Sequence, residues 1–227
     1  MKVLLCAYRN WALEVCEQIM SEHTSVTFCT ATSQEHLERL VTIHSFDAII
    51  TIGWSWKISA EIVKNNIVVG MHPSDLPDYA GGSPIQNQIL DGVETTRATL
   101  FKLNEKFDEG EIVDKEFIDL RGHLDDVLKS IGSASVQLVS RFLTQFPNNT
   151  YTKQAGVGKK VRRLKPADSQ LQNLMLDASV GEFFEERTMT CKEMWNHIRC
   201  RENPYPNAYF EDETGRLTIV KVEFEPK

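Results

Sequence analysis

The first 72 residues alternate between short apolar runs and amphipathic segments, and this alternation restricts the possible folds more than any other feature of the chain. Apolar runs at 2–8, 25–30, 46–52 and 67–71 have the length of buried strands, and segments with helical spacing of apolar residues separate them. Strands that alternate with helices in this way form a parallel sheet through right-handed crossovers. We therefore predict an α/β, Rossmann-like domain with a mostly parallel sheet.

The middle of the chain predicts a hairpin and a long helix that complete this domain. Residues 95–103 alternate like a half-exposed strand, and 111–120 follow as the hairpin partner across a turn at Asp108 to Gly110. Apolar residues at helical spacing then predict a helix over 124–146. The main domain is expected to span residues 1–150.

The remaining residues predict a smaller unit. A basic, glycine-containing stretch within 151–189 has the composition of a linker segment. Residues 190–227 then form a small C-terminal appendage, with a helix over 190–201 and a β-hairpin from strands at 208–211 and 217–224.

Composition excludes several classes of protein. The net charge of −7 disfavours nucleic-acid binding through general electrostatics, and no apolar stretch approaches the ~20 residues that span a bilayer. The five cysteines are scattered without a CxxC pair, so neither disulfides nor a zinc site is expected. No GxGxxG follows the first strand, which makes a dinucleotide cofactor improbable. The expected location is the cytoplasm, and the oligomeric state stays open, with a homodimer as one arrangement.

Two loops carry candidate chemistry. His72 ends an apolar strand and is followed by a stiff, proline-rich loop, which is where open α/β sheets place their functional groups. Asp108 lies in the turn of the predicted hairpin and offers a carboxylate. Each residue alone is more often structural, but the strands next to them are expected to lie side by side. Metal binding by His72, Asp75 and Asp78 lacks further ligands nearby, so no metal is expected.

Aromatic and basic residues suggest where a ligand is held, and for both an ordinary structural role stays open. Trp54 and Trp56 follow the third strand, where they wall a planar ligand or only cover the sheet edge. The basic residues between Lys159 and Lys165 form a solvated linker or contact phosphate groups.

Four short motifs, in the same order, resemble those of the folate-dependent formyltransferases. Residues 72–86 (HPSDLPDYAGGSPIQ) are similar to the family's Asn-x-His-x-Ser-Leu-Leu-Pro loop, and 108–112 to its Asp-x-Gly-x-Ile element. Residues 160–169 and 198–209 resemble the segment before the C-terminal unit and its Pro-Tyr-Pro stretch. In layout the chain is closest to the sugar N-formyltransferases.

This resemblance implies an enzyme that uses 10-formyltetrahydrofolate as the formyl donor and an amine as the acceptor. It implies that His72 stabilises the developing oxyanion and that Asp108 helps to remove the surplus proton. The folate is expected to contact Trp54, Trp56, Leu103, Phe107 and Asp108.

The chain departs from the family at a position that matters. Gly70 stands where the family has an asparagine, two residues before the histidine, that orients the formyl oxygen. Gln86 and Asn87 are the nearest amides in sequence, and the hypothesis is that Asn87 takes this role. Two alternatives remain: a 10-formyltetrahydrofolate hydrolase, and a non-catalytic protein that binds folate or a nucleotide sugar.

The acceptor is predicted to be a small molecule, a nucleotide-linked amino sugar. The short segment after the linker and the acidic balance argue against tRNA. The expected substrate contacts are Arg9, Asp75, Tyr79, Gly81 and Gly82. The sugar and its nucleotide are not determined by the sequence.

Overall fold

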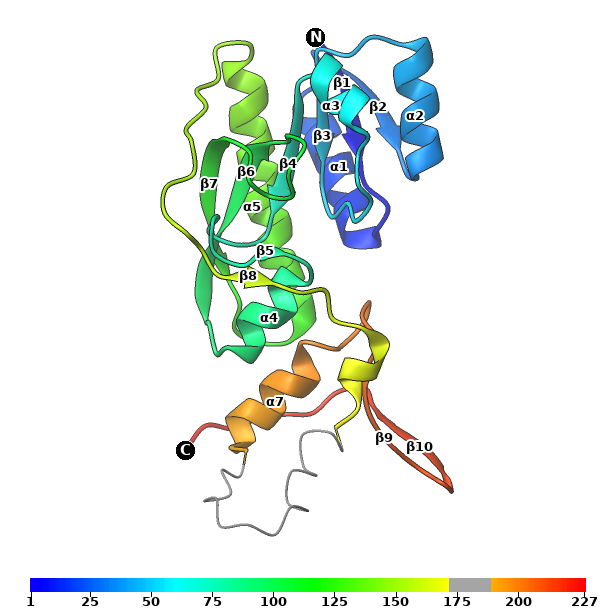
Figure 1. The fold of residues 1–227 in the computed structure, drawn as a ribbon, viewed down its shortest axis with the longest axis vertical. Helices are drawn as coiled ribbons and strands as arrows, with labels where there is room; N and C mark the ends of the chain where they lie inside the picture. Colours follow the sequence, from blue (N-terminus) through cyan, green and yellow to red (C-terminus); the bar gives the residue numbers. More distant parts are fainter. Residues whose placement is uncertain (172–188) are drawn as a thin grey trace.

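A six-stranded sheet organises the main domain of the computed structural model, which describes residues 1–171 and 189–227 (Figure 1). In spatial order its strands are β2 (Thr27–Ala31), β1 (Lys2–Cys6), β3 (Ala48–Thr51), β4 (Val68–His72), β6 (Thr95–Lys102) and β7 (Ile112–Asp119). The first four strands are parallel, whereas β6 is antiparallel to both β4 and β7. The mostly parallel α/β sheet predicted from the sequence is confirmed. The expected neighbours β4 and β6 are indeed paired.

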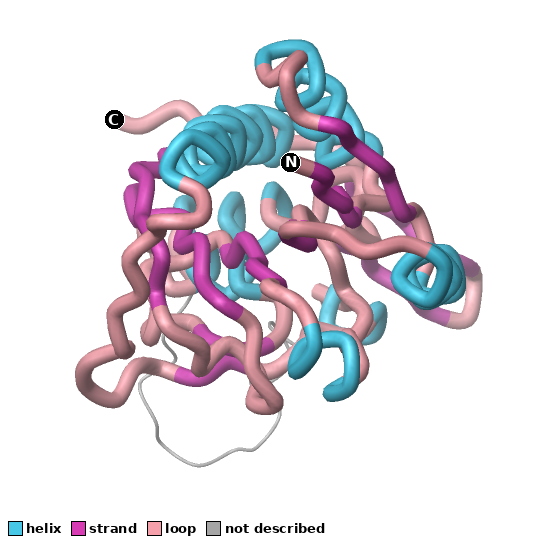
Figure 2. The backbone as a smooth tube through the Cα atoms, turned by 90° about the horizontal axis from the view of Figure 1, so that it is seen from above, coloured by secondary structure: helices cyan, strands magenta, loops and turns pink. Residues whose placement is uncertain are grey.

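Helices cover both faces of this sheet, as Figure 2 shows. Alternate residues of β1 point to opposite faces. Val3 and Leu5 pack in a core with α1 (Asn10–Glu22) and α5 (Leu124–Gln145). Leu4 and Cys6 pack in a second core with α2 (Gln34–Ile43) and α3 (Ala60–Asn65). Burial on both faces explains why this strand is a continuous apolar run.

The segment predicted as a linker crosses the main domain along 152–165, here called the connecting segment. Thr152 forms a β-bridge with Ile112, at the start of β7. Further along, β8 (Lys160–Val161) pairs with β5 (Ala80–Gly81), just before α4 (Pro84–Leu90). The chain continues through η1 (Pro166–Ser169). The domain boundaries at 150 and 189 stay predictions, and residues 172–188 of the proposed linker lie outside the described residues.

The C-terminal residues form α7 (Cys191–Arg199) and a hairpin of β9 (Ala208–Asp212) and β10 (Gly215–Ile219), which projects from the lower end in Figure 1. The helix and hairpin were predicted, but the second strand runs over 215–219 instead of 217–224. The buried Arg199 joins this unit to the main domain, because its Nη1 donates to the carbonyls of Leu120 (2.6 Å) and Gly122 (2.9 Å). Among the described residues, no helix is long and apolar enough to cross a membrane.

Candidate active site

A cleft of about 630 Å³ lies at the carboxyl ends of β1, β3 and β4. Loops after β1 and β3 contribute Arg9 and Trp54, the end of β4 contributes His72, and further lining residues include Leu103 to Asp108. The connecting segment and the C-terminal unit close one end. This edge of a parallel sheet is the position expected for a ligand site.

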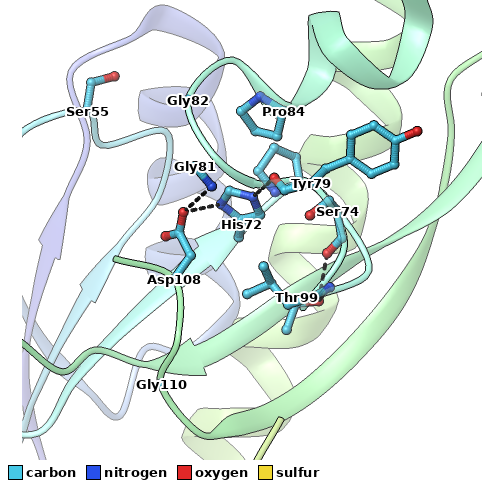
Figure 3. A network of polar contacts seen from close by, with 12 residues as sticks. Ser55, His72, Ser74, Tyr79, Gly81, Gly82, Pro84, Thr99, Asp108 and Gly110 are labelled. Atoms are coloured by element: carbon cyan, nitrogen blue, oxygen red, sulfur yellow. Dashed lines mark hydrogen bonds and ion pairs between the residues drawn. The ribbon is translucent and has the colours of Figure 1, made fainter. Parts of the chain in front are cut away.

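His72 is buried and held in one orientation by the loop that follows it (Figure 3). Its Nε2 lies 3.0 Å from the carbonyl of Tyr79, and its Nδ1 lies 3.7 Å from Oδ2 of Asp108. Because a carbonyl only accepts, Nε2 carries a hydrogen. In the neutral ring Nδ1 is therefore the unprotonated nitrogen, and it faces the Asp108 carboxylate.

The loop after His72 is fixed by a buried hydroxyl. Thr99, on the neighbouring strand β6, donates from Oγ1 to the carbonyl of Ser74 (2.7 Å) and accepts from the amide of Leu76 (3.2 Å). Ser74 in turn donates to the carbonyl of Asp78 (2.6 Å). These bonds explain how the loop keeps one conformation at the edge of the sheet.

Asp108 comes from the loop between β6 and β7, and its backbone φ is +54°, a region that favours glycine. Its Oδ2 accepts from the amide of Gly81 (2.8 Å), and Gln154 donates to its carbonyl (2.7 Å). The two predicted catalytic side chains, which are 36 positions apart in sequence, thus meet in the cleft.

The space beside Gly70 is occupied. A Cβ on this residue would lie 2.7 Å from Cδ1 of Leu103 and 3.0 Å from Oγ1 of Thr51. Both distances are shorter than ordinary carbon contacts. An asparagine does not fit here unless Leu103 moves.

The hypothesis that Asn87 replaces the family asparagine requires a correction. Its Nδ2 donates to the carbonyls of Gly82 (3.2 Å), Ser83 (2.9 Å) and Arg162 (3.2 Å), and the residue does not line the cleft. The preceding Gln86 does line it and is only 6% exposed. Asn87 joins α4 to the connecting segment, whereas Gln86 lines the cleft.

Aromatic residues wall the end of the cleft near Lys57. The rings of Trp54 and Trp56 lie 4.8 Å apart, and Trp56 and Phe107 remain 41% and 67% exposed while lining the cleft. Exposed aromatic faces of this kind fit a planar conjugated ring such as a pterin. Lys57 and Lys106 in the same wall fit the carboxylates of a folate tail.

Besides Lys57 and Lys106, four more cationic residues line the cleft: Arg9, Arg163, Lys165 and Arg201. None of these four has a carboxylate partner within the described parts of the chain. The nearby Asp168 is paired with Arg162 (2.7 Å). Arg201 is only 5% exposed and donates to the carbonyls of His197 (2.5 Å) and Asp168 (2.9 Å). The sequence did not single out Arg201, although this residue lies within the family-like stretch 198–209.

Two expected substrate contacts lie elsewhere. The side chain of Asp75 pairs with Lys115, and the hydroxyl of Tyr79 donates to Asp91 (2.8 Å); neither Asp75 nor Tyr79 lines the cleft. Of these two, only the backbone carbonyl of Tyr79 takes part in the site, through His72. Gly81 and Gly82 do line the cleft. No group of three potential metal ligands occurs within residues 1–171 and 189–227.

Comparison with known proteins identifies the family. Residues 13–133, more than half of the chain, match the family model described as "Formyl transferase". The chain belongs to the formyl transferase family, as its motifs predicted.

Individual relatives agree with this assignment. The methionyl-tRNA formyltransferase of Natranaerobius thermophilus is 29% identical over 154 residues, which cover 66% of this chain and 45% of that protein. A solved methionyl-tRNA formyltransferase from Clostridium thermocellum superposes with a TM-score of 0.81 at 23% identity, covering 99% of this chain and 94% of that one. A sugar N-formyltransferase from Shewanella sp. gives 0.75 at 15% identity, covering 100% and 99%. At 23% and 15% identity, these two structural matches show a shared fold and nothing further.

Proposed function

We propose that this protein transfers a formyl group from 10-formyltetrahydrofolate to the amine of a small molecule that carries phosphate groups, with a nucleotide-linked amino sugar as the candidate acceptor. The observation that carries the proposal is a single cleft with three parts. The His72–Asp108 pair, an aromatic wall and a set of cations without carboxylate partners among the described residues all line this one cleft. Family membership supports the donor, and the cations support a phosphorylated acceptor.

In this proposal the donor supplies an activated formyl carbon, and the protein supplies orientation and proton transfer. His72 keeps its Nε2 hydrogen on the Tyr79 carbonyl, so Nδ1 is the atom that accepts a proton from the attacking amine. Asp108, 3.7 Å from Nδ1, stabilises the imidazolium that results. We assign to Gln86, which lines the cleft, the donation of amide hydrogens to the formyl oxygen, the role first assigned to Asn87.

Incubation with 10-formyltetrahydrofolate and a panel of amines tests the proposal. The panel contains nucleotide-linked amino sugars, the same amino sugars without nucleotide, and methionyl-tRNA. Mass spectrometry is expected to show one added formyl group on a nucleotide-linked member.

Formate release without a formylated product would identify a hydrolase, and tight folate binding without turnover would identify a binding protein. Formylation of methionyl-tRNA alone would replace the small-molecule acceptor with the one named for the sequence relatives.

A further inference from the structure

The turn that carries Asp108 has an unusual backbone conformation. Asp108 has φ = +54°, which is unfavourable for a residue with a Cβ, and the neighbouring Phe107 is largely exposed. Such a conformation persists only where surrounding groups impose it. Contacts with neighbouring segments therefore help to keep Asp108 beside His72.

One side-chain amide holds both sides of the Asp108 turn. The Nε2 of Gln154 lies 2.7 Å from the carbonyl of Asp108 and 2.9 Å from that of Gly110. The two hydrogens of the amide thus reach two carbonyls that flank Glu109. A carboxamide offers two donors in a fixed plane, so this contact restrains the backbone on both sides of the turn.

Gln154 is itself anchored to rigid parts of the domain. Its neighbour Thr152 exchanges two backbone hydrogen bonds with Ile112 (2.7 and 2.8 Å) at the start of β7. Further along the connecting segment, β8 pairs with β5, which contains Gly81. Gly81 donates its amide hydrogen to the Asp108 carboxylate (2.8 Å). The connecting segment therefore supports Asp108 in two ways: Gln154 binds its carbonyl, and β8 pairs with the strand that carries Gly81.

Glu109 in this turn also forms two ion pairs, and both are weaker restraints. Lys106 lies 3.6 Å from Glu109, with both side chains exposed. Lys160 pairs with Glu109 at 2.7 Å, but both side chains are exposed and surface ion pairs of this kind restrain little.

We propose that Gln154 is a positioning residue that keeps the Asp108 carboxylate in reach of His72. The connecting segment, which the sequence presented as a linker, is thereby a structural part of the active site. This inference rests on the proposed formyl transfer, in which Gln154 itself touches no reacting atom. Its loss is expected to release the turn and move the carboxylate.

Gln154→Met tests this proposal because methionine keeps the length of the side chain and removes both donors. We expect kcat to fall about 10- to 100-fold, the scale typical of a small misplacement of a catalytic group, with little change in KM for either substrate. Gln154→Glu, which turns acceptors toward the two carbonyls, is the second variant in case the first does not fold. Lys153→Ala, an exposed neighbour, is the matched control and is expected to keep full activity.

A double-mutant cycle separates positioning from general destabilisation. If Gln154 acts through Asp108, Gln154→Met costs nothing further in an Asp108→Asn background. An equal loss in both backgrounds, or full activity of both Gln154 variants, would overturn the proposal.

Amide hydrogen exchange provides a measurement that is independent of turnover. Exchange at residues 104–111 is expected to be faster in Gln154→Met than in the wild type and in Lys153→Ala. Unchanged exchange at these residues contradicts the inference even if the wild type proves inactive. An inactive wild type with faster exchange in the variant would instead reject only the proposed function.

Discussion

His72 ends strand β4 and Asp108 lies in the loop between β6 and β7, and their hydrogen-bond partners indicate a role for each. The Tyr79 carbonyl fixes one ring nitrogen of His72 as a donor, which leaves the other facing Asp108. The sequence predicted both residues but assigned His72 the role of oxyanion donor. The geometry favours a proton acceptor, because the hydrogen on Nε2 is already used.

Removing either member of this pair is expected to lower kcat strongly. His72→Gln and Asp108→Asn are each predicted to reduce kcat about 10²- to 10⁴-fold, the usual contribution of a positioned acid or base. Steady-state kinetics with a formyl acceptor measures the effect, and thermal unfolding checks that the variants are folded. A rise in KM with unchanged kcat would instead assign His72 and Asp108 to substrate binding.

In the proposed mechanism the adjacent residues Gln86 and Asn87 have separate roles, so their alanine variants are expected to differ. Gln86→Ala is predicted to lower kcat about 10²- to 10³-fold, as removal of an oxyanion donor does. Asn87→Ala removes bonds to three backbone carbonyls and is predicted to lower the melting temperature more than the intrinsic rate. Comparable kcat values for wild type and Gln86→Ala would remove Gln86 from the mechanism.

Restoring the family asparagine at position 70 offers a complementary test. Gly70→Asn is predicted to destabilise the fold by about 1–3 kcal/mol, since its Cβ meets Leu103. Activity should fall and not rise. Denaturant unfolding measures the stability, and combination with Leu103→Ala is expected to recover part of it.

At the scale of elements, α7 ends just before Arg201, which lines the cleft. Burial, together with the charge of Arg201, lowers the pKa of His197 from 6.5 to about 4. The geometry agrees, because Nη1 of Arg201 lies 3.3 Å from Nδ1 of His197, which must therefore be unprotonated. Helix α7 therefore carries a neutral His197 next to the buried Arg201.

This arrangement predicts acid sensitivity. Between pH 6.5 and about 4 the unfolded chain protonates His197 while the folded chain does not, so the free energy of unfolding falls as pH decreases. The loss from this group should reach about 2–3 kcal/mol near pH 4. Urea unfolding across this range is expected to show a smaller loss for His197→Gln, which does not titrate. Parallel curves for the two proteins would contradict the shift.

The whole molecule is acidic, with a net charge of −7, yet its cleft gathers cations that lack carboxylate partners among the described residues. Concentrating positive charge in a cleft attracts anionic ligands without making the whole surface basic. At the sequence level the net charge disfavoured extensive nucleic-acid binding, but it gave no information about a local phosphate site.

Substrate affinity should reflect this local charge. Arg9→Ala and Arg163→Ala are each predicted to raise KM for a phosphorylated acceptor about tenfold or more, on the basis of 1.5–3 kcal/mol for a charged hydrogen bond. KM for the folate should stay nearly constant. Initial rates at two salt concentrations check the effect, with Lys129→Ala on α5 as a distant control. An unphosphorylated amine accepted equally well would argue against this assignment.

The sequence by itself determined the parallel sheet, the helices around it and the pairing of His72 with Asp108. Strand length, helical spacing and position at strand ends are local properties, and local patterns report them directly. The family motifs lie in the same loops, so they carried the likeness to formyltransferases as well.

Only the tertiary structure decided that Gln86 lines the cleft and Asn87 does not, and where the segment after residue 150 runs. Gln86 and Asn87 are adjacent, and the carbonyls that occupy Asn87 come partly from Arg162, 75 positions away. Gln154 reaches Asp108 across 46 positions, and Leu103 fills the space beside Gly70 from another strand end. Such contacts depend on how the loops converge in space, which the order of residues along the chain does not express.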